Sequence, residues 1–244
     1  MIIPGKCMVF ASKYLPPTIA RYGIVIAGLF IAGLVLAHGV EERDAIFLER
    51  NSGHALLAFA YLGAKHMITG YDHLLYLFGV IFFLYRPKDI AVYVTLFALG
   101  HSITLLGGVL ADINVNVYLV DAVIGLSVAY KAFENLDGFR RVFNVSPNPK
   151  IAVFLFGLVH GFGLATKLQA LTLSAEGLVA NIIAFNVGVE LGQLLALIFL
   201  LVLINALRAG GSFERKASVF NYVLMFAGFL LTAYQLAGFF LASA

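Results

Sequence analysis

The sequence predicts an all-α integral membrane protein, built as a bundle of seven transmembrane helices. Hydrophobic residues make up 61% of the 244 residues and charged residues only 12%, whereas soluble domains carry about 25% charged residues. The apolar residues are concentrated in runs of about 20, the length at which a helix crosses a bilayer. Basic residues alternate between the loops that join these runs, which gives the helices a consistent orientation.

Seven apolar runs define the expected helices. They lie near residues 22–37, 66–85, 90–111, 116–134, 151–168, 179–206 and 217–242. Residues 1–37 form either the first transmembrane helix or a signal peptide cleaved after Ala37, and cleavage would leave six helices. Residues 38–65 are expected to be an outer loop and an interfacial segment, although 54–65 is apolar enough to extend the second helix. Residues 66–244 then form a six-helix membrane domain.

Loop charges predict which ends face the cytoplasm, because Lys and Arg are retained on that side. Basic residues precede the first run and follow the second, fourth and sixth runs, and the other loops are mainly acidic. We therefore expect a cytoplasmic N-terminus and an outer C-terminus, in a bacterial inner membrane. The net charge of +3 is small and scattered, which gives no sign of nucleic-acid binding. The single cysteine, Cys7, excludes a disulfide framework.

Ionisable residues on five of the expected helices lie at a similar depth. Counted from the outer helix ends, they fall about 5 to 11 residues in, or about 8–16 Å at 1.5 Å per residue. These residues are His73, His101, Asp121, His160 and Glu190. Any one of them could be an ordinary hydrogen-bonding group between helices. An unpaired charge at such depth costs several kcal/mol, so the shared level favours a common site.

The stretch HMITGYDHLLYL places His66 and His73 seven residues apart, which on one helix puts both on the same face. Asp72 is then expected to orient an imidazole, as carboxylates do beside metal-bound histidines. Asn186, Glu190 and Gln193 are spaced to share one face of a later helix. Imidazoles and carboxylates without thiolates suit borderline divalent ions such as nickel, cobalt, zinc or iron.

Three classes of function fit this set of residues. A permease would take a divalent ion from the outer side and release it inward. A membrane metallohydrolase would use the same ligands with a bound water, but HExxH and GxSxG are both absent. An accessory subunit of a larger membrane complex would use its histidines only for hydrogen bonds. The permease is preferred to an enzyme.

These residues resemble the HupE/UreJ family of membrane proteins, whose members are regarded as nickel or cobalt permeases. The resemblance is carried by His66-x5-Asp72-His73 with the following LLYL, GHSITL at 100–105, Asp121 through Ser127, FGLVHGFG at 156–163 and FNVGVELGQ at 185–193. It implies a metal role for the HX5DH element. Nickel-permease members have a second histidine in the motif around His160, where this chain has Gly157. The match is therefore closer to the second HupE/UreJ branch.

The expected site combines both lines of reasoning. The expected metal-binding residues are His66, Asp72, His73, His101, His160 and Glu190, and the residues expected to support them or relay protons are Asp121, Ser102, Asn186 and Gln193. Nickel is the preferred ion, with cobalt, zinc, iron and copper as alternatives. The expected partners are the metal ion and the lipid bilayer, together with a membrane-complex partner or a second copy of the chain.

Overall fold

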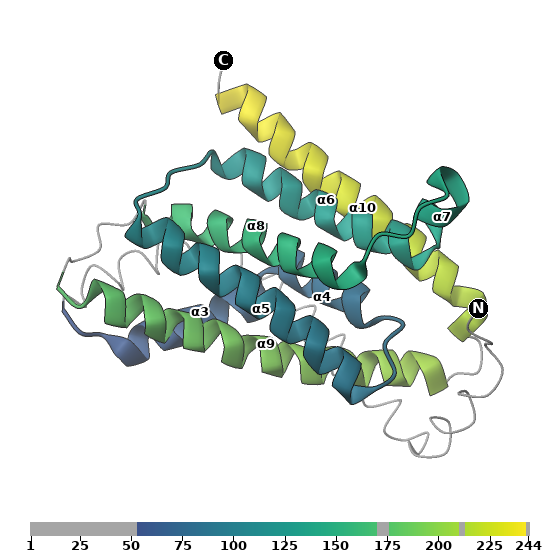
Figure 1. Ribbon diagram of the computed structural model, residues 1–244, viewed down its shortest axis with the longest axis horizontal. Helices are drawn as coiled ribbons and strands as arrows, with labels where there is room; N and C mark the ends of the chain where they lie inside the picture. The colour runs from purple at the N-terminus through teal and green to yellow at the C-terminus, as the bar shows by residue number, and fades with distance from the viewer. Residues whose placement is uncertain (1–52, 170–175, 210–212, 243–244) are drawn as a thin grey trace.

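The computed structural model describes residues 53–169, 176–209 and 213–242, and within these ranges the protein is helical, without strands (Figure 1). The helices are α3 (Leu56–Thr69), α4 (Tyr71–Ile81), α5 (Pro87–Leu110), α6 (Val117–Asn135), α7 (Gly138–Phe143), α8 (Pro149–Gln169), α9 (Leu178–Ala209) and α10 (Phe213–Ala242). The all-α prediction is confirmed. The predicted run 22–37 and the signal-peptide alternative lie outside the described residues.

Four described helices are long and apolar enough to cross a membrane. These spans are Pro87–Leu110, Pro149–Gln169, Leu178–Ala209 and Lys216–Ala242. Helix α6 has 19 residues but carries Asp121, Lys131 and Glu134, and α4 has only 11 residues. The chain is therefore a membrane protein by the length and composition of its helices, and the predicted number of seven spans stays a prediction.

The predicted continuous helix over 66–85 is wrong, because the chain forms two helices there. Helix α3 ends at Thr69, Gly70 has φ −70° and ψ 97°, and α4 begins at Tyr71. A Cβ at position 70 would lie 2.9 Å from both the His66 carbonyl oxygen and the His73 Nδ1, so a larger residue would force the chain around this break to shift. The apolar stretch before His66 is part of α3. His66 and His73 consequently lie on different helices.

Side chains bond some of the backbone groups at both ends of the short helix α4, where such groups lack partners within the helix. At its start, the Asp72 carboxylate accepts the backbone N–H of His73 at 2.9 Å. Past its end, the Arg208 guanidinium donates to the carbonyl oxygens of Phe82 at 2.6 Å and Leu84 at 3.1 Å. Helix α9 thus anchors the end of α4 that leads into the loop before α5.

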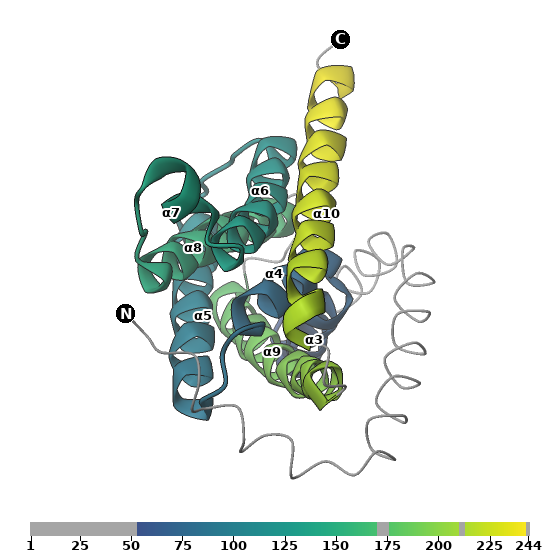
Figure 2. The same ribbon diagram turned by 90° about the vertical axis from the view of Figure 1, so that its right-hand side faces the viewer.

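The long helices pack as three pairs around α4. Helix α3 lies along α9, α5 along α8, and α6 along α10, while α4 contacts α5, α6, α9 and α10 (Figures 1 and 2). Each pair approaches closely at a glycine. A Cβ at Gly188 would meet the Ala60 carbonyl oxygen, one at Gly157 would meet the Phe97 carbonyl oxygen, and one at Gly228 would meet the Ala129 nitrogen. Such close approach brings residues of neighbouring helices together.

Candidate functional site

Four histidines from four helices lie together beside the break between α3 and α4. The His73 ring centroid is 5.0 Å from that of His66, 4.9 Å from that of His160 and 6.2 Å from that of His101. His73, His101 and His160 are at most 3% exposed, and His66 is half-buried. We call these four residues the histidine cluster, and their predicted role as metal ligands stays a prediction.

Aromatic rings enclose the histidine cluster on one side. The Phe97 ring lies 5.0 Å from the His160 ring and 6.5 Å from the His73 ring. The Tyr76 ring lies 5.4 Å from the His160 ring. The imidazoles are therefore held in an apolar environment, where an unpaired polar atom is costly.

Asp72 determines which ring nitrogen of His73 has a lone pair available to bind a metal ion. Its Oδ1 lies 2.9 Å from His73 Nδ1. A carboxylate can only accept a hydrogen bond, so in the neutral imidazole Nδ1 carries the proton and Nε2 keeps its lone pair. This is the arrangement by which carboxylates orient metal-bound histidines, as expected for Asp72 from the sequence.

Ser127 has the same effect on His160. The Ser127 hydroxyl donates its single hydrogen to the Ile124 carbonyl oxygen at 2.7 Å, and its oxygen lies 3.2 Å from His160 Nε2. The serine oxygen must then accept from an Nε2–H group, which leaves the lone pair of His160 on Nδ1. Ser127 is fully buried. Ser127 ends one of the motifs that carry the family resemblance, but it was not among the expected site residues, because a serine in a helix more often bonds only its own backbone.

The nitrogens left over by these bonds form a potential ligand set. His66 Nε2, His73 Nε2, His160 Nδ1 and both ring nitrogens of His101 are buried and have no hydrogen-bond partner among the described residues. Buried polar atoms in proteins nearly always have a partner, and an unsatisfied one costs about 1–3 kcal/mol. Each neutral imidazole has one lone pair, so the four rings can offer at most four ligand nitrogens, of the kind that borderline divalent transition metals bind.

The spacing of the rings is compatible with a shared ion, but the ligand set is not preassembled. Two imidazoles on one tetrahedral ion have ring centroids about 5 Å apart, given metal–nitrogen distances of about 2.0–2.1 Å. The His66–His73 and His73–His160 pairs meet this spacing. However, no group of three or more His, Cys, Asp or Glu side chains in the described ranges is placed to hold one ion at once. Ring rotations would be needed to bring a third ligand in.

Three residues expected to support the ligands instead connect α5 with α9. Asn186 Nδ2 donates to the Ser102 hydroxyl at 2.8 Å, and that hydroxyl donates to the Ala98 carbonyl oxygen at 2.7 Å. Gln193 Nε2 lies 3.4 Å from the Val94 carbonyl oxygen. These bonds fix α9 against the helix that carries His101.

Asp121 forms an ion pair that the sequence analysis did not predict. Its Oδ2 accepts from Lys167 Nζ at 2.9 Å, and the two side chains are 10% and 38% exposed. Its Oδ1 is buried without a partner among the described residues. A carboxylate from α6 is thus balanced by an ammonium group from the end of α8.

The structure does not bring Glu190 to the histidine cluster. Its side chain is exposed, whereas Val189, Gly192 and Gln193 are buried on the packed face of α9. Successive helical residues point about 100° apart, so Glu190 is turned away from the face that packs on α3. The depth of Glu190 along the helix does not determine which way its side chain points. The prediction that Glu190 lies among the metal ligands is therefore corrected.

Comparison with known proteins finds a matching protein family. Residues 42–243 match the family model described as HupE / UreJ protein. The match includes all four members of the histidine cluster as well as Asp72 and Ser127. No curated protein and no solved structure matches the chain.

Proposed function

The chain belongs to the HupE/UreJ family, and on this premise we propose that it is a permease for a divalent transition metal, with nickel the preferred ion. The family is linked to the transport and handling of nickel and cobalt. The observation that carries the proposal is the set of five unpartnered ring nitrogens in the histidine cluster. In this function the ion is the cargo of the protein.

The cluster supplies the ligands for the ion. His73 Nε2 and His160 Nδ1 carry lone pairs because Asp72 and Ser127 hold their other nitrogens. His66 Nε2 and one nitrogen of His101 complete an imidazole set, which suits nickel, cobalt, zinc and copper. A set that converges only when its rings rotate binds less tightly than a rigid one, and moderate affinity is what a transported ion needs for release.

The broken helix supports transport in particular. Many secondary transporters bind their cargo where a helix is interrupted near the middle of the membrane. Here the interruption at Gly70 separates His66 from His73, so a change in the angle between α3 and α4 alters the distance between two ligands. We propose seven spans with a cytoplasmic N-terminus, in a bacterial inner membrane, which places the cluster in the outer half of the bilayer.

The test measures bound metal and uptake together. We expect the purified protein, loaded with nickel and desalted, to retain stoichiometric nickel by elemental analysis, and energised vesicles containing it to accumulate the ion. The double variant His66→Ala/His73→Ala should lose both properties. His54→Ala is the matched control, since this histidine is exposed outside the cluster and its loss should change neither. Absence of nickel from the wild-type protein would refute the proposal, and stoichiometric nickel without uptake would favour the metalloenzyme alternative.

A further inference from the structure

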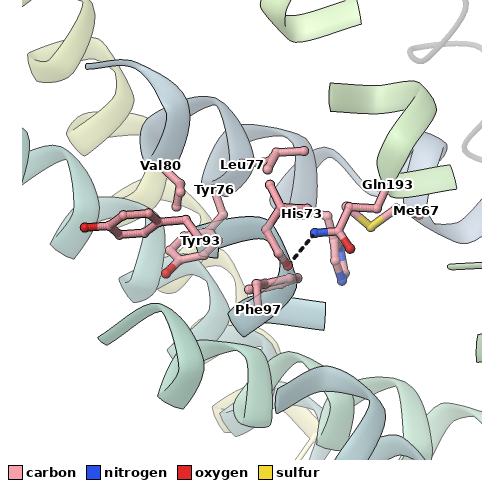
Figure 3. Close-up of a pocket in the computed structure, with 9 residues that line it drawn as sticks. Met67, His73, Tyr76, Leu77, Val80, Tyr93, Phe97 and Gln193 are labelled. Carbon is pink, nitrogen blue, oxygen red and sulfur yellow. Dashed lines mark hydrogen bonds between the residues drawn. The ribbon is translucent and has the colours of Figure 1, made fainter. Parts of the chain in front are cut away.

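A polar pocket lies outside the histidine cluster. The cavity beside His73 has a volume of about 10 Å³ and a mostly apolar wall that includes Leu77 and Val80 (Figure 3). The polar pocket is larger, with a volume of about 120 Å³, and its wall includes Asn135, Asp137, Arg141, Ser218 and Asn221. One water molecule needs about 10–15 Å³, so the polar pocket has room for a group of several non-hydrogen atoms.

The polar pocket lies at the predicted cytoplasmic end of the helices. Phe83 lines it just after α4, and Ser218 lines it near the start of α10. Asp137 and Arg141 lie between α6 and α8. The three connections that hold or adjoin these residues all contain Lys and Arg, which predicts that they face the cytoplasm. We therefore place the polar pocket at the level of the lipid headgroups of the inner leaflet.

Two opposite charges line the polar pocket without pairing. Asp137 precedes α7, and Arg141 belongs to that helix. Both side chains are exposed, and within the described residues neither takes part in an ion pair. A molecule in the polar pocket therefore has a guanidinium group and a carboxylate within reach, and both groups form strong hydrogen bonds with an opposite charge.

Neutral polar groups complete this lining. Asn135 Nδ2 donates to the Gly79 carbonyl oxygen and to Asn221 Oδ1, which uses both of its hydrogens and leaves the Asn135 Oδ1 to accept. The Ser218 hydroxyl is exposed and can donate. The polar pocket thus offers acceptors for an ammonium group and donors for a phosphate group.

An apolar strip leads from the polar pocket along α10. Tyr222 lines the pocket, and Phe226 and Phe229 follow it at the spacing of one helix face. These three side chains, which we call the α10 strip, are 55%, 69% and 52% exposed. Helix α10 lies at the edge of the bundle and packs mainly on α6 (Figure 2). In a bilayer the α10 strip faces acyl chains.

We propose that the polar pocket binds the headgroup of a phospholipid that carries both a phosphate and a primary ammonium group. The Arg141 guanidinium and the Ser218 hydroxyl donate to the phosphate, and the Asp137 carboxylate and Asn135 Oδ1 accept from the ammonium. The acyl chains lie along the α10 strip. A choline headgroup has no N–H to donate, and a glycerol headgroup leaves the carboxylate without an opposite charge, so both fit less well.

The experiment measures the lipid that the purified protein retains. The full chain in detergent is mixed with equal amounts of phosphatidylethanolamine, phosphatidylglycerol and phosphatidylcholine and examined by native mass spectrometry. We expect about one phosphatidylethanolamine to be retained, preferred at least about tenfold over each of the others, as for the loss of one hydrogen bond to a charged group. Asp137→Asn and Arg141→Gln should each lower this retention by about tenfold.

Arg140→Gln is the matched control, because Arg140 is exposed on α7 but does not line the polar pocket, and its loss should leave retention unchanged. All three variants should unfold at the wild-type temperature.

Three results would overturn the inference. Equal retention of the three lipids, or a preference for phosphatidylglycerol, would refute the zwitterionic headgroup. Retention that neither Asp137→Asn nor Arg141→Gln lowers would place the lipid elsewhere. Displacement of the lipid by an equal concentration of free phosphoethanolamine would show that a soluble zwitterion is the ligand. The inference is independent of the permease proposal, because none of these results depends on nickel binding or uptake.

Discussion

Buried polar residues are satisfied in one region of this bundle and left open in another. Where α4, α6 and α10 meet, Asn135 Nδ2 donates to the Gly79 carbonyl oxygen and to Asn221 Oδ1, both at 2.9 Å. Farther along the pair of α6 and α10, the Thr232 hydroxyl lies 3.2 Å from the Ala122 carbonyl oxygen. These polar groups hold helices together, and the neighbouring chain supplies the partners that they need.

The histidine cluster lies in an equally apolar setting but leaves five ring nitrogens without such partners. Burial alone therefore does not distinguish structural polar residues from binding residues. The gathering of several open nitrogens in one place distinguishes them, because single open atoms also occur on structural residues such as Asn186 and Arg208, whereas five together are costly to maintain in an apolar environment. Substitutions in the two regions test this distinction, and loss of a histidine is expected to have the largest effect.

Loss of His73 should weaken nickel binding by the histidine cluster more than any other single substitution. His73→Ala removes the imidazole that neighbours the other three, so we expect nickel affinity to fall by more than about 100-fold, beyond the loss typical of residues that only orient a ligand. Isothermal titration of the purified protein measures this change. An affinity equal to that of His54→Ala would contradict the assignment of the cluster as the ion site.

Asp72 should contribute through the orientation of His73. For Asp72→Ala we expect a loss of about 10–100-fold in nickel affinity, because the His73 ring becomes free to turn and to change tautomer. Asp72→Asn should lose less, since its amide oxygen can still accept from Nδ1–H. If the two variants bind nickel equally tightly, the hydrogen bond to His73 does not set the affinity.

Ser127 should have a smaller effect of the same kind, because a neutral hydroxyl orients His160 less strongly than a carboxylate. We expect Ser127→Ala to weaken nickel binding by about tenfold. In the metal-free wild-type protein, ¹⁵N NMR of labelled histidine should show His160 protonated on Nε2, and the variant should show a mixture of tautomers. A wild-type His160 protonated on Nδ1 would rule out this role.

A substitution where α4, α6 and α10 meet should lower the stability of the protein and leave its nickel affinity unchanged. Asn221→Leu leaves the Asn135 amide without one partner, so we expect the free energy of unfolding to fall by about 1–2 kcal/mol. Thermal unfolding in detergent measures this loss, while nickel affinity should stay at the wild-type value. A marked decrease in affinity would show that the two regions are not energetically distinct.

The sequence was sufficient to predict an all-helical membrane protein, whereas the metal site of the histidines stays a prediction. Depth along alternating helices placed His73, His101 and His160 at one level, since helix length and direction follow from hydrophobicity and loop charge. The stretch HMITGYDHLLYL also suggested Asp72 as a carboxylate that orients an imidazole. These predictions needed no knowledge of how each helix is rotated about its axis.

Rotation and local backbone geometry explain the remaining differences. Glu190 lies at the expected position along α9 but on an exposed face. The break at Gly70 depends on the space beside His66 and His73, which a single glycine in an apolar run does not reveal. The contact between Ser127 and His160 and the ion pair between Asp121 and Lys167 each join two helices, so they follow from packing rather than from sequence spacing.

X-ray absorption at the nickel edge tests the central claim, that the unpartnered imidazoles are ligands of one ion. For the wild-type protein loaded with one equivalent of nickel, we expect scattering from at least three imidazole rings, with nitrogens at about 2.1 Å. His73→Ala should lose one ring from this pattern, and His54→Ala should leave it unchanged. A first shell of oxygen atoms alone, or a spectrum that His73→Ala does not alter, would contradict the account.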